Sequence, residues 1–308
     1  MMPSMKLIDN RCPICGSCED YTVIYKRNFE IADLNKDIFS ARRIPDRVHY
    51  QIVRCNKDKL VRSTPVLDGQ FVYSLYRESK FTYAEETGNL AATYIGILRP
   101  ILDKLPKDAK VLEIGCGNGF VLAALCAMGF NDVSGIEPSV DAAAKADEKI
   151  RKNILTDILK PDTFKANTFD LIFFFQTFDH LQDPNAFLKI CYNITVPGGS
   201  IVTVNHDIDS LQAKILKEKS PIIDIAHPFF YGADTIGEIF KKNSFNPVRV
   251  YSPLSTVSIR HLVLLAPIPK LLKKRLLDSK PAFLRALLNK SMRTRLGNIC
   301  LIATKKTA

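Results

Sequence analysis

The sequence predicts an α/β protein built on a doubly wound, mostly parallel sheet of seven strands, with a small cysteine-containing module at its N-terminal end. Two observations predict this fold class. Apolar strand-like runs alternate with helical segments from about residue 84 onward. A glycine-rich turn at residues 115–119 joins an apolar strand to a helix, as the ligand-binding turns of such sheets do.

Length and composition suggest one main domain with appendages. The chain has 308 residues, of which 46% are hydrophobic and 24% charged, which are typical globular values. We expect a cysteine-containing module at residues 1–67, a linker at 68–83 and the main domain at 84–308, with a basic helical insertion at about 266–296. No run of 18 uninterrupted apolar residues occurs, and residues 1–11 lack the apolar segment of a signal peptide, so we expect a cytoplasmic protein.

The most informative segment is an apolar strand at residues 111–114 that contains Glu113 and is followed by Gly115, Gly117 and Gly119. Glycine permits positive φ and leaves no Cβ in the way of a ligand that approaches the main chain. Residues 120–128 then predict a helix that ends before Gly129. The turn therefore predicts a ligand-binding loop, and a glycine turn without a ligand is the alternative.

The spacing of the glycines separates two classes of ligand. A dinucleotide fingerprint has the form G-x-G-x-x-G, and its helix N-terminus faces a pyrophosphate. This turn has the form G-x-G-x-G, and the nearby Glu113 would repel an anion. A short strand at residues 131–137 ends in Glu137, about 20 residues beyond the turn, where such folds place the carboxylate that binds ribose hydroxyls. These residues favour a ligand with an adenosine and an ammonium group but no phosphate.

These residues resemble the first motif, E/D-x-G-x-G-x-G, of the class I S-adenosylmethionine-dependent methyltransferases, and the resemblance extends over roughly residues 84–308. It implies the Rossmann-like methyltransferase fold, S-adenosyl-L-methionine as cofactor and enzymatic methyl transfer. It also implies that Glu113 and the glycine loop hold the methionyl part of the cofactor, Glu137 the ribose, and Asp157 with Ile158 the adenine. The implied cofactor-binding set is Glu113, Gly115, Cys116, Gly117, Asn118, Gly119, Glu137, Pro138, Asp157, Ile158 and Gln176.

The remaining elements follow in order along the chain. Residues 152–158 predict a third strand, and the continuous apolar run at 168–177 predicts a fourth that is covered on both faces. Asp183 and Pro184 are typical of an N-cap and a first helical residue. A turn at 197–199 leads to a fifth strand, and a later helix precedes two further strands; these segments are residues 200–205, 234–243, 246–251 and 298–304.

Cysteines are concentrated near the N-terminus. Cys12 and Cys15 form a C-x-x-C-G pattern, which is typical of half a zinc knuckle. In methyltransferases that resemble this chain and carry an N-terminal zinc ribbon, the second half is another C-x-x-C. The corresponding positions here are Cys55 and Asp58, so the resemblance implies Cys12, Cys15, Cys55 and Asp58 as zinc ligands. Cys18 or His49 could replace one ligand, and a metal-free remnant of the ribbon or a disulfide are the alternatives.

Positive charge is concentrated near the C-terminus. Residues 268–308 contain eleven Lys and Arg and one acid, so they account for nearly all of the formal net charge of +11. Apolar residues at helical spacing on both sides of Pro281 predict two short helices within an insertion between two neighbouring strands. Three interpretations stay open: a solvated cover over the substrate cleft, contact with an anionic membrane surface or lipid-linked substrate, and nucleic-acid binding, which the scarcity of aromatic residues disfavours.

Histidines identify the side of the sheet where the methyl acceptor would bind. His180, His206 and His227 fall in loops that we expect to open at the carboxyl edge of the sheet, whereas His49 and His261 do not. Phe178-Asp179-His180 is similar to the Glu-His pair that often follows the fourth strand in small-molecule methyltransferases, although the acid is Asp here. His180 and His227 are therefore the candidate catalytic residues, and structural roles are the alternative for both; His206 is expected to be structural or to lie beside the cofactor.

The expected function is methyl transfer from S-adenosylmethionine to oxygen of a small molecule, a sugar or a lipid-linked glycan. We expect a cytoplasmic enzyme that can sit peripherally at a membrane. An RNA methyltransferase is the alternative enzyme, because some guanine methyltransferases join a cysteine-rich module to this fold. A non-catalytic binding module on a methyltransferase scaffold is the alternative from another class.

Overall fold

The computed structural model describes residues 6–30, 47–82, 84–265, 268–277 and 281–307. A seven-stranded sheet in the order β12-β15-β10-β9-β6-β7-β8 forms its centre. Four neighbouring pairs are parallel, and β15 runs antiparallel to both β10 and β12. This confirms the predicted doubly wound, mostly parallel sheet. The strands are β6 (Lys110–Ile114), β7 (Asp132–Ile136), β8 (Ile154–Leu155), β9 (Phe169–Phe175), β10 (Thr195–His206), β12 (Phe245–Tyr251) and β15 (Asn298–Lys305).

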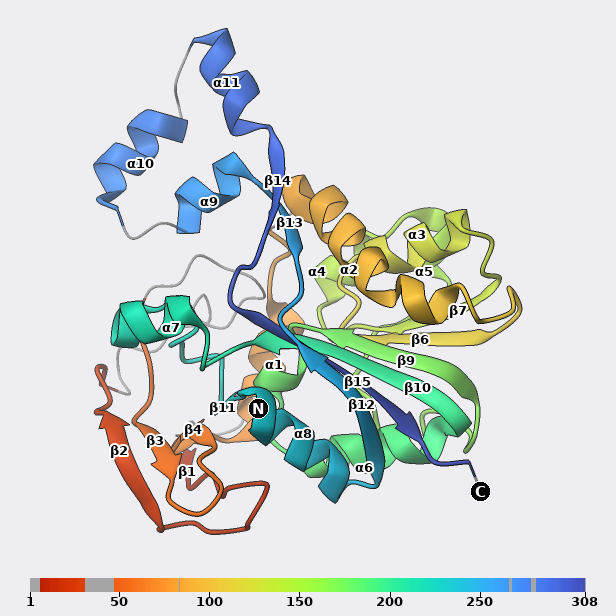
Figure 1. Cartoon of the computed structure of the whole chain (residues 1–308), viewed down its shortest axis with the longest axis horizontal. Helices are drawn as coiled ribbons and strands as arrows, with labels where there is room; N and C mark the ends of the chain where they lie inside the picture. Colours follow the sequence, from red (N-terminus) through yellow and green to blue (C-terminus); the bar gives the residue numbers. More distant parts are fainter. Residues whose placement is uncertain (1–5, 31–46, 83, 266–267, 278–280, 308) are drawn as a thin grey trace.

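Helices cover both faces of this sheet (Figure 1). A separate apolar core lies on each side of the sheet. The side chains of β9 alternate between the two cores: Phe174 packs with residues of α6 and α8, and Phe173 with residues of α2 and α3. The continuous apolar run of this strand is therefore buried on both faces, as expected of a central parallel strand. The covering helices are α2 (Thr87–Leu102), α3 (Phe120–Ala127), α6 (Pro184–Ile194) and α8 (Ala233–Lys242).

Local sequence signals predict most ends of the helices and strands to within one or two residues of their observed positions. Helix α3 ends before Gly129, which has a φ of 90°. At the start of α6 the Asp183 side chain accepts a hydrogen bond from the backbone N–H of Ala186, and Pro184 is the first helical residue. Two further short helices, α4 (Val140–Ala144) and α5 (Glu148–Arg151), lie between β7 and β8.

Two strands differ from their predicted extents. The third strand, expected at residues 152–158, is reduced to the two residues of β8, because the N–H of Asp157 bonds to the carbonyl of Leu155 and the Asp157 carboxylate accepts the N–H of Ile158. The chain thus turns where the ladder would have continued. Strand β10 begins earlier than expected, because Thr195 already pairs with Phe169, and its register with β9 shifts before Ser200.

The cysteine-containing segment forms a four-stranded antiparallel sheet in the order β11-β4-β3-β2, beside a β1–β5 pair. Strand β11 belongs to the segment between β10 and α8, so the main domain supplies one edge strand of this sheet. The fully buried Arg62 donates to the carbonyls of Asn10 and Cys18 within it. The strands are β1 (Leu7–Ile8), β2 (Tyr21–Tyr25), β3 (Ile52–Cys55), β4 (Val61–Ser63), β5 (Val66–Leu67) and β11 (Phe229–Phe230); residues 1–5 and 31–46 of the predicted module lie outside the described residues.

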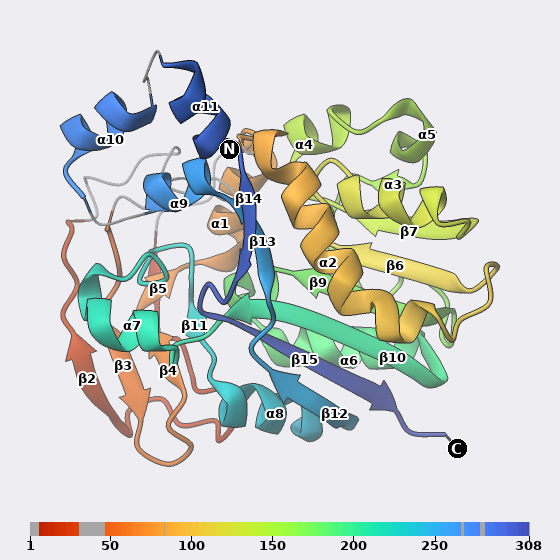
Figure 2. The same cartoon turned by 45° about the horizontal axis from the view of Figure 1, so that its top comes forward.

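The range expected to be a linker, residues 68–83, contains α1 (Gly69–Glu78), whose N-cap Asp68 accepts a hydrogen bond from the N–H of Gln70. Figure 2 shows α1 and the cysteine-containing sheet on the side of the molecule toward which the parallel strands point. The 3-10 turns η3 (Ala84–Glu86), η4 (Phe178–His180) and η5 (Lys217–Lys219) and the helix α7 (Leu211–Leu216) complete this part of the chain.

The basic insertion between β12 and β15 contains the two predicted helices, α10 (Lys270–Leu277) and α11 (Ala282–Leu288), one on each side of Pro281. It also contains α9 (Ile259–Leu265) and an antiparallel pair, β13 (Ser255–Ser258) with β14 (Ser291–Thr294), which local pattern did not predict. Thr93 of α2 accepts the N–H of Thr256 at 2.8 Å, which ties this pair to the main domain. The predicted insertion residues 266–267 and 278–280, Lys280 among them, lie outside the described residues. None of the helices in the described ranges is long and apolar enough to cross a membrane.

Candidate functional site

The glycine loop leaves β6 in a conformation that only glycine adopts readily. Gly115, Gly117 and Gly119 have φ values of 76°, 57° and 70°. A Cβ on Gly119 would lie 2.8 Å from Ile150 Cγ2, and a Cβ on Gly115 would collide with the Thr177 hydroxyl just beyond β9. The loop is thus packed against the segment that follows β9, so groups at the ends of β6 and β9 share one site.

Glu137, at the end of β7, reaches back to this loop. Its carboxylate accepts the N–H of Gly117 and the N–H of Ser139, each at 2.8 Å, and the residue is 9% exposed. Each carboxylate oxygen has a second lone pair, so these bonds leave capacity to accept hydroxyl donors such as those of a ribose. The carboxylate therefore supports the binding loop and faces the same site.

Asp157 lies two residues beyond β8 and is more exposed than Glu137. It accepts hydrogen bonds from the Lys160 ammonium and, at 3.2 Å, from the Tyr73 hydroxyl. The bond from Lys160 is the main reason why the pKa of Asp157 lies below its ordinary value. The neighbouring Ile158 is 40% exposed, which leaves an apolar side chain beside the carboxylate.

Other residues of the predicted cofactor set line the same edge. Cys116 is buried and Pro138 is half-buried, and burial raises the pKa of the Cys116 thiol, so this thiol is un-ionised. Gln176 directly follows β9 with a φ of 52° and donates its side-chain N–H to Asn298 Oδ1. Glu113 is buried in β6, opposite Phe173 of β9.

Buried side-chain oxygens without a hydrogen-bond partner gather at this edge of the sheet. In folded proteins nearly all buried polar atoms are paired, so an unpaired one indicates that a ligand, ion or water binds there. Most of these oxygens are hydrogen-bond acceptors, so they fit a ligand that carries donor groups such as hydroxyl and amino groups. Within the described part of the chain these oxygens are Asn118 Oδ1, Gln176 Oε1, Asp179 Oδ1, Asn205 Oδ1 and Tyr231 Oη.

Helix α1 contacts both the Asp157 side and the His180 side of the site. Tyr73 and Tyr76 are three residues apart, so both point from one face of the helix. Tyr73 contacts Asp157, whereas the Tyr76 hydroxyl lies 2.9 Å from His180 Nδ1. This range was expected to be a linker, and the spacing of the two tyrosines after the Asp68 N-cap is the sequence signal that indicates a helix here.

Three histidines surround one buried aspartate at the carboxyl ends of β9 and β10, as the sequence predicted for the positions of the histidines. Asp179 is 2% exposed, and its Oδ2 lies 2.7 Å from His206 Nδ1 and 4.0 Å from His227 Nε2. Its Oδ1 lies 3.9 Å from His180 Nε2. The ring centroid of His227 lies 4.6 Å from that of His180 and 4.9 Å from that of His206. We refer to these four residues as the His–Asp cluster.

The partners of the histidines assign their tautomers. His180 Nδ1 lies 3.0 Å from the carbonyl of Ala226, and His227 Nδ1 lies 2.8 Å from the carbonyl of Ile222. A carbonyl only accepts, so in both rings Nδ1 donates and Nε2 carries the lone pair. Two imidazole lone pairs therefore point toward Asp179.

Burial shapes the charges in this cluster. Burial, and then the neighbouring His227, lower the pKa of His180 to about 3, and burial also lowers the pKa of His227, so both rings are neutral. Burial alone would raise the pKa of Asp179. The hydrogen bond from His206 outweighs this effect and holds the pKa of this carboxyl well below its usual range. Asp179 and His206 are 27 residues apart, so local sequence pattern does not reveal that they are partners.

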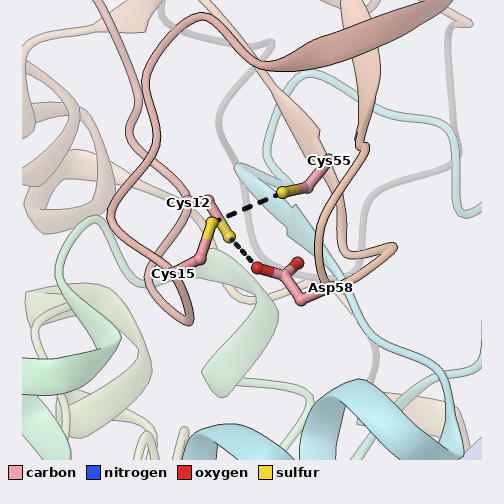
Figure 3. A group of neighbouring side chains, drawn as sticks. All are labelled: Cys12, Cys15, Cys55 and Asp58. Atoms are coloured by element: carbon pink, nitrogen blue, oxygen red, sulfur yellow. Dashed lines mark hydrogen bonds between the residues drawn. The ribbon is translucent and has the colours of Figure 1, made fainter.

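A second group of metal-ligating residue types lies in the cysteine-containing segment (Figure 3). Cys12 Sγ lies 3.0 Å from Asp58 Oδ2, Cys15 Sγ lies 3.5 Å from Cys55 Sγ, and one ligand atom from each residue lies within 4.8 Å of the others. All four are the predicted ligands. Burial is the main cause of a raised pKa of the Cys12 thiol, and the Asp58 carboxylate adds to it.

The suggested replacement ligands lie elsewhere. His49 bonds through Nδ1 to the carbonyl of Tyr50 and through Nε2 to Glu218, and Cys18 is not part of the group. The cysteines of the described residues are all free, so the disulfide alternative is not seen.

The loop between Cys12 and Cys15 docks onto the main domain. Lys242 of α8 donates to the carbonyls of Pro13 and Ile14, each at 2.7 Å, and Asn185 of α6 donates to the carbonyl of Pro13 at 2.9 Å. The side chains of Cys12 and Cys55 belong to the same apolar core as residues of β9. The cysteine group is therefore part of the packing of the main domain.

The sequence matches a family model described as a methyltransferase domain over residues 87–250, which is more than half of the chain. The chain is 30% identical over 148 residues to an uncharacterized methyltransferase of Schizosaccharomyces pombe, covering 41% of this chain and 48% of that protein. It is 30% identical over 115 residues to a ubiquinone biosynthesis O-methyltransferase of Methylococcus capsulatus, covering 35% and 47%. The chain thus spans about half the length of these curated relatives.

Solved structures with a similar fold include a geranyl diphosphate C-methyltransferase of Streptomyces coelicolor. It superposes with a TM-score of 0.47 and 11% identity, covering 70% of this chain and 77% of that structure.

Proposed function

This chain belongs to the S-adenosylmethionine-dependent methyltransferases, and from that premise we propose that it methylates a hydroxyl oxygen of a small molecule, a sugar or a lipid-linked glycan. The observation that carries the proposal is the convergence of the His–Asp cluster with the glycine loop at one edge of the sheet. Relatives named ubiquinone biosynthesis O-methyltransferases support oxygen as the acceptor atom.

The residues at the glycine loop suit the cofactor. We propose that Glu113, Cys116, Asn118 and the three loop glycines hold the methionyl part, with Gln176 beside them. Glu137 and Pro138 then contact the ribose, and Asp157 with the exposed Ile158 contacts the adenine. The unpaired oxygens of Asn118 and Gln176 support this assignment, because a buried acceptor is stabilised by an ammonium or hydroxyl donor.

The His–Asp cluster suits a hydroxyl acceptor. Because Nδ1 of His180 and of His227 donates to a backbone carbonyl, each Nε2 offers a lone pair that can accept a hydrogen bond from a hydroxyl group. S-adenosylmethionine, when bound, supplies an electrophilic methyl group with a good leaving group. The protein then has to align the acceptor oxygen and receive the hydroxyl proton as the oxygen–methyl bond forms. We propose His180 and His227 as the residues that contact the acceptor.

The proposal is tested with an acceptor screen that uses radiolabelled cofactor against phenols, sugar nucleotides, lipid-linked glycans and RNA. We expect label in a hydroxyl-bearing small molecule or glycan. His180→Ala and His227→Ala should each lose about 100-fold or more of kcat, whereas His261→Ala, which alters a histidine of α9 outside the cluster, should retain activity. Label in RNA alone, or unaltered turnover of both cluster variants, would overturn the proposal. Absence of cofactor binding by calorimetry, with the chain folded, would exclude a cofactor-dependent enzyme.

We further propose that the four residues of Figure 3 bind one structural zinc ion. Three thiolates and one carboxylate oxygen can surround zinc tetrahedrally. The four ligand atoms are already close together, and the thiols are crowded beside a carboxylate, an arrangement that a cation stabilises. Because the Cys12–Cys15 loop docks on α6 and α8, zinc would also stabilise the main domain.

Elemental analysis of the purified chain tests this assignment. We expect about one zinc ion per chain. Cys12→Ser should lose the ion, and Asp58→Ala should bind it with lower affinity. Cys126→Ser, whose exposed thiol lies outside the group, should retain it. A zinc content below one tenth per chain after purification without chelator, and no uptake on titration, would refute it.

We also propose that the basic insertion contacts an anionic membrane surface. Phe283 is 74% exposed and Leu272 and Leu287 are 46% and 44% exposed, beside the cationic residues of α10 and α11. Apolar side chains among Lys and Arg are typical of segments that bind anionic lipid. Vesicle co-sedimentation should show binding to phosphatidylserine vesicles that salt weakens and Phe283→Ser reduces. Equal binding to phosphatidylcholine vesicles, or binding to RNA but to neither vesicle, would overturn this assignment.

A further inference from the structure

The His–Asp cluster has the composition and geometry of a cation site. Asp179, His206 and His227 each offer one ligand atom, and these three atoms lie within 4.8 Å of one another. They come from the segment after β9, the end of β10 and the loop before β11, so tertiary folding alone brings them together. We infer that these three side chains bind one divalent first-row transition-metal ion that holds the acceptor oxygen.

An unpaired oxygen supports a cation over a purely hydrogen-bonded cluster. His206 pairs only with Oδ2 of Asp179, and the buried Oδ1 has no hydrogen-bond partner. Its neighbour His180 Nε2 is 3.9 Å away, beyond hydrogen-bonding distance. A buried carboxylate oxygen that lacks a donor is costly, and a metal ion that draws on both carboxylate oxygens removes that cost.

The outer contacts also match a metal site. A histidine that ligates a metal usually donates its other ring N–H to a carbonyl or carboxylate, which sets the tautomer and orientation of the ring. His227 does so toward the carbonyl of Ile222 at 2.8 Å, which aims Nε2 at Asp179. His206 Nδ1 faces the same carboxylate oxygen at 2.7 Å, so a cation would take the place of the proton between them.

Ligand chemistry indicates the class of ion. Two imidazoles and one carboxylate suit Mn²⁺, Fe²⁺ or Zn²⁺, and three protein ligands leave coordination positions open. The side chains of His206 and His180 are 31% and 22% exposed, so the cluster is reached from solvent on that side. The carboxylate of Asp179 supplies one negative charge, so a bound divalent ion keeps a net positive charge, which suits a negatively charged acceptor oxygen.

The role of the ion rests on the proposed O-methyl transfer, whereas its binding does not. A hydroxyl group held by a divalent cation would lose its proton more readily, and Nε2 of His180 would receive that proton while Nε2 of His227 ligates the ion. The resulting oxyanion would bond to the methyl group as the bond between that methyl group and the sulfonium sulfur breaks. The substrate class would then be one whose hydroxyl oxygen can ligate the ion.

Binding is measured with Mn²⁺ as the probe, because the soft thiolates of the cysteine group select zinc over Mn²⁺. Electron paramagnetic resonance of free Mn²⁺ follows a titration of the full chain. We expect one Mn²⁺ per chain, with affinity reduced about 10- to 100-fold in His206→Gln and lost in Asp179→Asn, but unchanged in His261→Gln. Thermal melting of each variant reports folding, and the half-exposed His206 decides the case if Asp179→Asn does not fold.

An undiminished free Mn²⁺ signal with the wild-type chain, or superimposable titrations of wild type and His206→Gln, would overturn the inference. The activity assay separates it from the proposed function. Mn²⁺ bound by the cluster without label transfer to any hydroxyl acceptor would leave the cation site standing and refute O-methyl transfer. Label transfer without Mn²⁺ binding would refute the cation site alone.

Discussion

Glu137→Ala is expected to weaken both the binding of S-adenosylmethionine and the stability of the fold near the glycine loop. The carboxylate accepts the N–H groups of Gly117 and Ser139, each at 2.8 Å, from a side chain that is almost buried. A hydrogen bond to a charged group contributes about 1.5–3 kcal/mol. Loss of both, with partial compensation by water, should lower the free energy of unfolding by roughly 2–4 kcal/mol.

Glu137→Ala should also lower the affinity for the cofactor. If Glu137 also accepts the two ribose hydroxyls, its removal costs about 1.5 kcal/mol or more for each bond, and every 1.4 kcal/mol raises Kd about tenfold. We therefore expect Glu137→Ala to raise Kd about 100-fold or more. Glu137→Gln keeps the shape and one acceptor oxygen, so it should lie between wild type and Glu137→Ala in both measurements.

Isothermal calorimetry with S-adenosylmethionine and S-adenosylhomocysteine measures the affinity, and urea denaturation measures the free energy of unfolding. Asp132→Asn is the matched control, because Asp132 is exposed at the opposite end of the same strand. Affinity within twofold of wild type in Glu137→Ala, with unchanged stability, would refute both the ribose contact and the loop support. If Glu137→Ala does not fold, the Gln variant decides.

The remaining predictions concern the loop, the adenine side and the cysteine group. Gly119→Ala should destabilise the chain by about 1–2 kcal/mol in urea denaturation, because φ is positive there and Ile150 leaves no space for a Cβ; unchanged stability would contradict this. Lys160→Gln should raise the pKa of Asp157 toward its ordinary value, followed by carboxyl-carbon NMR, since the Lys160 hydrogen bond is the main cause of its lowering. Stability that comes from this lowered pKa is present above the unfolded-state pKa and is lost on acidification, so the variant should differ least from wild type at low pH. The pair is partly exposed, so solvent screening keeps the loss of stability at neutral pH small. Removal of zinc by a chelator should lower the melting temperature of the wild type, and a melting curve insensitive to chelator would argue against a structural metal.

Most of the sheet was predictable because its signals are local. The apolar run before Gly115, the caps at Asp183 and Pro184, and the glycine at 129 each specify backbone geometry within a few residues, and the structure confirms those elements. The shortened β8 is the exception. There the side chain of Asp157 bonds to its own backbone surroundings, and a period-two pattern does not reveal that competition.

The site was predictable in part. Loop positions at strand ends predicted that His180, His206 and His227 would share one edge, and the structure brings them together. The role of Asp179 and the cover by α1 were not predicted. Both depend on contacts between segments far apart in the chain, such as Tyr76 with His180.

The sequence by itself determined the fold class, the glycine loop and the C-x-x-C pattern of Cys12 and Cys15, because backbone conformation, strand burial and C-x-x-C spacing are encoded over short stretches. Only the tertiary structure decided which ionisable groups face one another. The 46-residue separation of Cys12 from Asp58 and the 27-residue separation of Asp179 from His206 close when the chain packs its apolar cores. Burial then lowers the pKa of His180 and of His227, because the cost of desolvating a charge depends on the whole surrounding fold.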